Sequence, residues 1–453
     1  MNHRLNQFAN VFLMAALLLG SQLLTASAAD HNLVRISNGW DGSQADGSSY
    51  GAAISADGRY ILFESYADNL IKGGPPKDAN GNYRLYLFDQ KTGKTELVSI
   101  APDGSPTYGG DGTISADGRY VAFSSSISEM QSQQIYLRDR KNGKTLLVSS
   151  PTDGSKPDNS AAVAAISGSG RYIAFSSFAG NLVKGDGDQL PDIFVRDMQQ
   201  NKIYLASASS SGQKGNSDSG DTGAPSISAD GRYVAFSSYA TNLVQGDTNG
   251  AADIFVHDIR TGKTERVSVS SSGKQANDRS QSPAISGDGR FVAFISWATN
   301  LVPADSNGAA DVFVHDRSTG RTERVSVSST GKQQTLGDLY GYGGFDKISM
   351  SFDGRYVTFT SQATNFAKGI SINTCHYPIG ENINEPCTNI YVHDRQTGRT
   401  SIISVSNSNK SGNGASYSPS MSQDGQWTAF VSEASNLVKG DTNNQTDIFF
   451  YWR

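Results

Sequence analysis

One ten-residue phrase recurs seven times along the chain, and this repetition restricts the fold more than any other feature. The phrase reads ISADGRYVAF in its most regular copies. Its central glycine lies at Gly58, Gly118, Gly170, Gly231, Gly289, Gly354 and Gly425. Phrases such as DIFVHD and TERVSVS follow each copy, although the chain ends before the last TERVSVS. Such repetition is typical of one structural unit that is stacked many times.

Each repeat predicts four β-strands, which we call a, b, c and d. Strand a precedes the Asp-Gly pair, strand b is the RYVAFSS segment, strand c is DIFVHD, and strand d is TERVSVS. These segments are rich in β-branched and aromatic residues, and Asp-Gly supplies the positive φ of a tight hairpin. No helical spacing of apolar residues is sustained beyond residue 30. Seven units that cover each other's faces predict an all-β, seven-bladed β-propeller of four-stranded antiparallel blades.

The two ends of the chain predict how the ring closes. The chain stops at Arg453 after a strand c, whereas residues 33–36 match a strand d that has no repeat before it. We expect this N-terminal strand to complete the last blade beside residues 448–451, because closure removes the exposed edges of an open sheet. Residues 30–453 would then form a single propeller domain.

The first 29 residues predict export. Arg4 is the only Lys, Arg, Asp or Glu before Asp30, an apolar run extends from Val11 to Leu24, and small residues occupy 26–29. This is the pattern of a cleaved signal peptide, because the run is shorter than the ~20 residues of a membrane anchor, which is the alternative. We expect a periplasmic or secreted monomer that is not embedded in the membrane. The net charge of −5 argues against nucleic-acid binding, which requires a basic surface.

The ISADGRYVAFSS…DIFVHD pattern resembles the TolB-type, WD-like propeller repeat of exported bacterial proteins, over nearly all of residues 30–453. The resemblance implies a propeller that serves as a protein-binding platform, as part of a larger peptidase or, in some members, as an enzyme. The chain departs from TolB itself, because it has seven repeats where TolB has six and shows no separate N-terminal α/β domain. No α/β-hydrolase domain follows the repeats, in contrast to the peptidase relatives.

Acidic loops between strands b and c carry the clearest chemical pattern. Oxygen-bearing side chains recur at positions 1, 3 and 7 of four such loops: Asp186, Asp188 and Asp192; Asp247, Asn249 and Asp253; Asp305, Asn307 and Asp311; and Asp441, Asn443 and Asp447. Calcium takes six to eight oxygen ligands, so each loop could hold a structural calcium ion with the help of carbonyls and water. The alternative is that these oxygens cap the turn by accepting bonds from backbone N–H groups.

Departures from the repeat predict where a ligand binds. Strand order puts the b–c and d–a loops on one face, and function concentrates in such long, varied loops on a rigid scaffold. One departure is the loop 335–347, in which Tyr340, Tyr342 and Phe345 could stack on a sugar or anchor a protein. They could equally pack against the neighbouring blade. A second departure is the aromatic group near Trp40 and Tyr50.

The third departure is the insertion 369–388, which contains both cysteines of the chain. Cys375 and Cys387 are twelve positions apart, and export to an oxidising compartment predicts a disulfide between them. We expect this bridge to brace the insertion and to contribute on the order of 3 kcal/mol locally.

The sequence contains no G-x-S-x-G, H-E-x-x-H or phosphate-loop motif. His257, His315 and His393 take the strand-c position that arginine holds in two other repeats, which predicts a solvated position. We therefore expect a non-catalytic propeller that binds a protein or glycan ligand on the b–c/d–a face. The alternative is a hydrolase or lyase that acts on an extracellular polymer from the same face. It would require two or more carboxylates or histidines outside the repeat to converge at the channel mouth.

Overall fold

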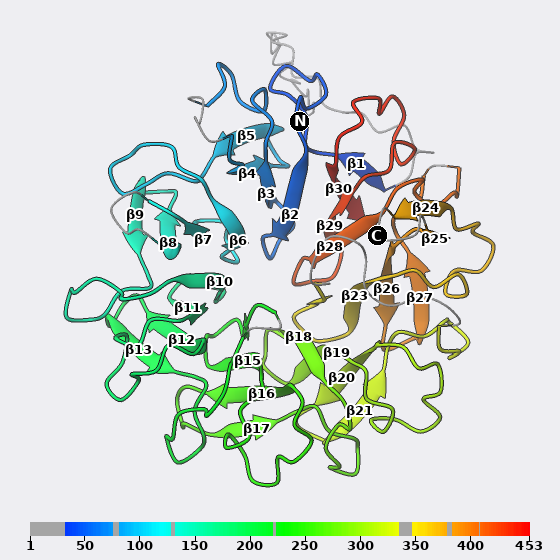
Figure 1. Cartoon of the computed structure of the whole chain (residues 1–453). Coiled ribbons are helices and arrows are strands. Elements are labelled where there is room, and N and C mark those ends of the chain that lie inside the picture. Colours follow the sequence, from blue (N-terminus) through cyan, green and yellow to red (C-terminus); the bar gives the residue numbers. More distant parts are fainter. Residues whose placement is uncertain are drawn as a thin grey trace, which may run out of the picture. The chain divides into compact units, whose positions relative to one another are not determined.

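The protein is a ring of seven antiparallel sheets (Figure 1). The computed structural model describes residues 32–75, 81–127, 132–220, 223–334, 347–377, 383–406 and 408–453. Within these ranges the chain forms strands and turns, and no helix is long and apolar enough to cross a membrane. The predicted seven-bladed, all-β propeller is confirmed.

Six blades follow chain order and contain strands a to d from one repeat. They are β2 (Ser49–Ile54), β3 (Tyr60–Ser65), β4 (Arg84–Asp89) and β5 (Lys94–Leu97); β6 (Gly110–Ile114), β7 (Tyr120–Ser125), β8 (Gln134–Asp139) and β9 (Lys144–Leu147); β10 (Ala161–Ile166), β11 (Tyr172–Ser177), β12 (Asp192–Asp197) and β13 (Lys202–Leu205); β14 (Ser226–Ile227), β15 (Tyr233–Ser238), β16 (Asp253–Asp258) and β17 (Thr264–Arg266); β18 (Ser280–Ile285), β19 (Phe291–Ser296), β20 (Asp311–Asp316) and β21 (Arg321–Arg324); and β22 (Ser349–Met350), β23 (Tyr356–Ser361), β26 (Asn389–Asp394) and β27 (Arg399–Ile402).

The seventh blade is built from both ends of the described chain. It combines β28 (Ser416–Met421), β29 (Trp427–Ser432) and β30 (Asp447–Trp452) with β1 (Leu33–Arg35). In this blade β1 pairs antiparallel with β30, so that Val34 lies opposite Phe450. The predicted closure of the ring is therefore confirmed, and the outer edge of β30 is paired.

The hydrophobic core lies between neighbouring blades rather than in one central mass. One buried cluster, for example, joins Val195 of the third blade to Phe236 of the fourth, and another joins Phe63 of the first to Phe450 of the seventh. The strand-b and strand-c aromatics of a blade also stack, as Phe175 and Phe194 do with ring centroids 5.8 Å apart. Burial of these side chains is the main stabilising term, and it requires both neighbours of every blade.

The turn glycines explain why the phrase ISADGRYVAF is repeated so closely. Gly118 has φ +72°, and a Cβ placed on it would lie 2.1 Å from the ring of Tyr60 in the preceding blade. Gly58 has the same geometry against Trp427, which carries this contact from the last blade to the first. Both the left-handed backbone and the close approach exclude a side chain.

Arginine of the Asp-Gly-Arg turn pairs with the aspartate that ends strand c in the first six blades. The N···O distances are 2.6–2.9 Å, and the pairs are Arg59–Asp89, Arg119–Asp139, Arg171–Asp197, Arg232–Asp258, Arg290–Asp316 and Arg355–Asp394. The guanidinium of Arg59 holds the pKa of Asp89 below its usual value. These repeated charges therefore serve the scaffold.

Candidate functional site

The inner side of each blade lines the central channel, and one position of the repeat faces it in all seven blades. This position lies within strand a in five blades and two residues before β14 and β22 in the other two. The seven residues are Gly51, Asp111, Val163, Ala224, Ser282, Lys347 and Ser418, which all line a cavity of about 540 Å³. Five of these strands are bulged next to this position, and Asp111 has φ +50° there. A bulge bends the strand and redirects a side chain, which is why such irregularities often occur at sites.

Two of the seven positions carry a charge, and a third charge comes from strand b of the first blade. Asp111 and Lys347 lie in the ring itself, and Glu64 reaches it because Gly51 has no side chain. A Cβ on Gly51 would lie 2.8 Å from Oε1 of Glu64. The backbone N–H of Asp111 donates to the same oxygen at 2.7 Å. This group, which we call the channel site, lies at the b–c/d–a end of the channel.

The environment of the channel site changes its protonation. Burial, together with the nearby charge of Asp111, raises the pKa of Glu64 to about 7. Desolvation lowers the pKa of Lys347, whose side chain lines the cavity. Its ammonium donates to the carbonyl of Ala52 at 3.3 Å. Near neutral pH the site can therefore hold or release a proton at Glu64.

A run of four tyrosines borders the channel site. The rings of Tyr50, Tyr66, Tyr83 and Tyr108 meet edge to face in that order, with centroids 4.9–6.2 Å apart. The hydroxyls of Tyr83 and Tyr108 lie 2.8 Å apart, and a Cβ on Gly110, next to Asp111, would be 3.0 Å or less from both. Burial raises the pKa of Tyr83 above its usual value, so its hydroxyl stays protonated. The tyrosines thus add aromatic surface and neutral hydroxyl groups.

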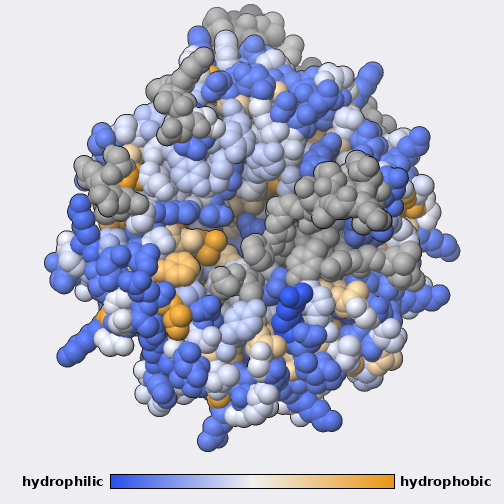
Figure 2. Space-filling model, viewed as in Figure 1, coloured by the Kyte–Doolittle hydropathy of each residue, from blue (hydrophilic) through white to orange (hydrophobic). Residues whose placement is uncertain are grey.

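The opposite end of the channel is narrow and apolar. Seven strand-a residues surround the axis there: Ile54, Ile114, Ile166, Ile227, Ile285, Met350 and Met421. Beyond them, backbone hydrogen bonds of 2.8–3.1 Å join the a–b turns in a closed circle. In each turn one backbone N–H donates to the equivalent carbonyl of the next blade, and the residues are Ala56, Ala116, Gly168, Ala229, Gly287, Phe352 and Gln423. The cavity at this end has only about 130 Å³. On the face seen in Figure 2 the surface is mostly hydrophilic, and its hydrophobic residues are scattered, with several beside the hollow at the centre.

A positively charged side chain lies at the centre of three predicted calcium loops. The guanidinium groups of Arg266, Arg324 and Arg35 each contact the carboxylates at positions 1 and 7, at 2.9–3.4 Å. The Asn at position 3 points its NH₂ at the position-7 aspartate, as Asn249 does to Asp253 at 3.1 Å. The Oδ1 of this Asn accepts a hydrogen bond from the backbone N–H of the residue two positions later in the chain. This arrangement favours turn capping over calcium at the loops that begin at Asp247, Asp305 and Asp441.

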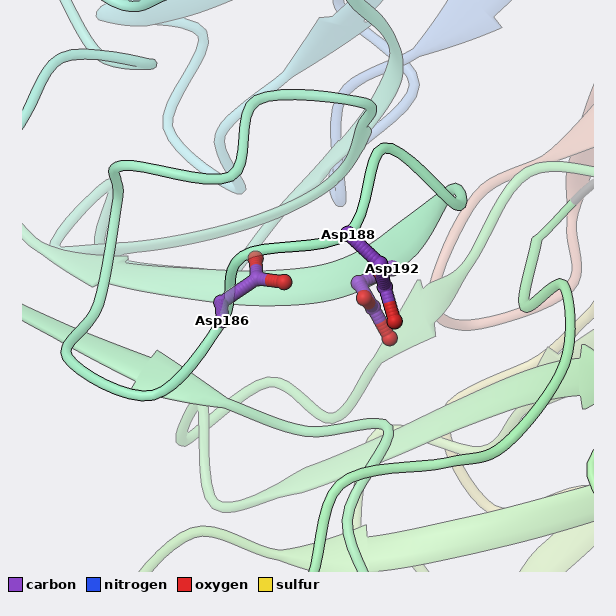
Figure 3. Close-up of side chains that lie close together, drawn as sticks. All are labelled: Asp186, Asp188 and Asp192. Carbon is purple, nitrogen blue, oxygen red and sulfur yellow. The ribbon is translucent and has the colours of Figure 1, made fainter.

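The loop of the third blade differs, because it has three carboxylates and a lysine. Oxygens of Asp186, Asp188 and Asp192 lie within 4.8 Å of one another, and the carboxyl of Asp186 points towards the other two (Figure 3). The ammonium of Lys214 contacts all three, at 3.1 Å from Asp186 and 2.7 Å from Asp192. Burial raises the pKa of Asp192 to about 6. Such an acidic group could hold a metal ion in place of the lysine.

The strand-c histidines do not occupy the solvated position that we predicted. His257, His315 and His393 are only 5–6% exposed, and Nδ1 of each lies 2.8 Å from a threonine of strand d. The prediction was wrong because the d strand covers this position with a threonine, which in turn donates to a carbonyl of the preceding blade. Burial lowers the pKa of each histidine. They join blades and lie outside the channel site.

The other predicted residues have mixed outcomes. Cys375 and Cys387 form the expected disulfide, which links β24 (Thr374–Tyr377) to the residue directly after β25 (Ile383–Pro386). Tyr340, Tyr342 and Phe345 lie outside the described residues. Trp40 is 55% exposed and is not part of the channel site, whereas Tyr50 borders it.

Sequence analysis did not identify Glu64 or Asp111, although a signal for both existed. The residue before the final serine of strand b is Ser, Ile, Thr or Val in the other six repeats and Glu only at Glu64. Likewise, among the seven equivalent strand-a positions, only Asp111 and Lys347 are charged. A position-by-position comparison of the repeats would have shown these departures.

Comparisons with known proteins support the fold. No family model matches the chain, and no curated protein is similar to it in sequence. Among solved structures, an oligogalacturonate lyase from Vibrio parahaemolyticus matches with a TM-score of 0.53 at 12% identity, over 93% of each chain. The propeller domain of the trilobed protease from Pyrococcus furiosus matches with a TM-score of 0.50 at 12% identity, over 89% of this chain and 93% of that one.

A putative TolB from Agrobacterium tumefaciens is also similar, with a TM-score of 0.38 at 19% identity, over 61% of this chain and 79% of that one. The structural neighbours thus include TolB and other propeller proteins. The lyase and the protease domain support the propeller fold, and at 12% identity they leave the chemistry to be argued from this chain's own residues.

Proposed function

We propose that this chain is an exported propeller that binds a glycan at the b–c/d–a end of its central channel. One observation carries the proposal: Glu64, Asp111 and Lys347 all depart from the repeat and converge on a cavity of about 540 Å³. A cavity of this size with a few convergent polar groups is typical of a small-ligand site. Export is supported by the signal-peptide pattern of residues 1–29 and by the disulfide.

The chemistry of the channel site suits a sugar better than a flat protein surface. Carboxylates and tyrosine hydroxyls can pair with the many hydroxyls of a sugar, and the half-exposed ring of Tyr66 offers apolar surface. The polar groups also lie inside the channel, where a folded partner can reach them only with a protruding segment. A protein ligand is the alternative that the binding experiment must distinguish.

Binding of short oligosaccharides by the purified mature chain tests the proposal. Calorimetry with linear glucan, chitin and galacturonan oligomers is expected to detect one of these series, and Glu64→Gln is expected to weaken that binding at least tenfold above pH 7. Glu96→Gln is the matched control, because Glu96 is exposed on strand d and pairs with Arg140 away from the channel. The proposal fails if the wild-type chain binds none of the oligomers, or if both variants weaken binding equally.

A second candidate function is catalysis at the same site, as a hydrolase or lyase. The specific observation in its favour is that two carboxylates outside the repeat, those of Glu64 and Asp111, converge on the channel as this candidate requires. The pKa of Glu64, at about 7, also suits a general acid or base near neutral pH. Asp111 would supply a second carboxylate from the neighbouring blade. Incubation of the bound oligomer with the wild-type chain, followed by product analysis, tests this candidate. Intact oligomer after prolonged incubation would leave binding as the function.

Calcium remains a proposal for the loop of the third blade alone. Lys214 is a flexible point charge, so calcium could replace its ammonium among Asp186, Asp188 and Asp192, whereas the arginines of the other three loops lie on paired strands. Melting of the chelator-treated chain with and without calcium tests this, with Asp188→Asn as the variant. We expect calcium to raise the melting temperature of the wild type only, and an equal rise in both would contradict the assignment.

A further inference from the structure

Exposed aromatic side chains recur at one repeat position on the b–c/d–a face. Tyr66, Phe178 and Tyr239 each follow the last residue of strand b directly, and they remain 49%, 36% and 38% exposed. Tyr66 belongs to the tyrosine run beside the channel site, and the other two occupy the same position in the third and fourth blades. In the fifth blade the position is Trp297, and the guanidinium of Arg279 lies over its ring, 4.0 Å from the ring centroid. The repeat therefore places these rings at the ends of strands b on the b–c/d–a face, one strand outward from the strands that line the channel.

The channel wall on the side of the third to fifth blades carries no charge among the described residues. It consists of small and apolar residues such as Val163, Ala164, Ala224, Pro225 and Pro283. Glu64 and Asp111 belong to the first and second blades, and the ammonium of Lys347 reaches the carbonyl of Ala52 in the first blade. A ligand at the mouth thus meets polar groups on one side and apolar surface on the other.

The far end of the channel prevents a polar chain from threading through. The ring of five isoleucines and two methionines separates the large cavity from the small one, and the circle of backbone hydrogen bonds lies beyond it. Passage of a sugar unit would remove its hydroxyls from water without offering partners, which is costly. A long ligand can therefore enter only from the b–c/d–a face, and only by one of its ends.

We propose that the ligand is a linear oligosaccharide, whose terminal unit enters the channel site while the following units lie over Phe178 and Tyr239. The inference rests on the proposed glycan-binding function and adds the length and polarity of the ligand. Aromatic rings with exposed faces stack on the apolar faces of sugar rings at low entropic cost. The face of the propeller then acts as an extended subsite outside the channel.

Chain length and end-blocking test the inference in the same calorimetric assay. Affinity is expected to rise at least tenfold between the one-unit and the four-unit member of the oligomer series that binds. Phe178→Ala is expected to weaken binding of the four-unit oligomer about tenfold without affecting the single unit, and Phe178→Trp is expected to restore it. Phe352→Ala is the matched control, because Phe352 is 41% exposed at the opposite, narrow end of the channel.

Blocking the chain ends separates end-on entry from binding along the chain. A bulky fluorophore on one end of the four-unit oligomer is expected to abolish binding, and the same fluorophore on the other end is expected to be tolerated. Equal affinity for one and four units, or tolerance of both blocked ends, overturns the inference while the proposed function stands. Failure of all oligomers to bind, with binding of an extended peptide instead, overturns both.

Discussion

Replacing Glu64 by glutamine is expected to stabilise the propeller in alkaline solution and to change little in acid. Glutamine resembles the protonated carboxyl in shape, and its Oε1 can still accept the N–H of Asp111. The pKa of Glu64 rises from 4.5 to about 7 on folding, because burial and the charge of Asp111 disfavour the carboxylate. The folded state therefore binds the proton more tightly than the unfolded state does, and stability falls as the pH rises from 4.5 through 7.

The size of the effect follows from the same shift. At ~1.36 kcal/mol per pH unit, the ionised carboxyl costs ~3 kcal/mol at pH 8.5 but only ~1 kcal/mol at pH 5. Water in the channel screens part of this cost, so we expect Glu64→Gln to gain ~2 kcal/mol more at pH 8.5 than at pH 5. Comparing the variant with the wild type at each pH cancels the contribution of other titrating groups.

Urea denaturation of both proteins at pH 5 and pH 8.5 measures this difference. Glu96→Gln again serves as the control, because its carboxylate lies in solvent and its replacement is expected to change stability by the same small amount at both pH values. If Glu64→Gln shifted stability equally at the two pH values, or destabilised the protein at pH 8.5, the conclusion that burial and the charge of Asp111 disfavour the Glu64 carboxylate would be wrong.

Two further predictions concern the scaffold. Gly118→Ala is expected to lower the free energy of unfolding by ~2–4 kcal/mol, because Gly118 has φ +72° and the new Cβ would lie 2.1 Å from Tyr60. Gly93→Ala is the control and is expected to cost only ~1 kcal/mol, because Gly93 has φ +67° but nothing within 4 Å of its Cβ position. Thermal melts of both variants check this, and equal costs would contradict the packing argument. Double replacement of Cys375 and Cys387 by serine is expected to speed amide hydrogen exchange in β24 and β25 while protection in the blades stays unchanged. Loss of protection throughout the ring would show that the disulfide stabilises more than the insertion.

The scaffold is highly predictable from the sequence, because each structural requirement is local and is repeated. The Asp-Gly pair needs its positive φ in every blade, and the first aromatic ring of strand b packs against the turn glycine of the next blade. Residues 33–36 match a strand d, and only the last repeat has no strand d of its own. A lone pair of cysteines close in sequence likewise has one option for pairing. Such features are read from neighbouring residues, and the structure confirms them.

The candidate site is less predictable, because its members come from distant repeats. Glu64, Asp111 and Lys347 belong to three blades, and only the closed ring brings them to one channel. The acidic loops show the same limit: their oxygens at positions 1, 3 and 7 suggest calcium, but Arg266 and its equivalents approach them from strand d, and Lys214 approaches from the following loop. The sequence by itself determined the number of blades, their strands and the closure of the ring, since these depend on local turns and periodic burial. Only the tertiary structure decided which charges meet, since the energy of a carboxylate depends on the groups within a few ångströms of it and not on its neighbours in the chain.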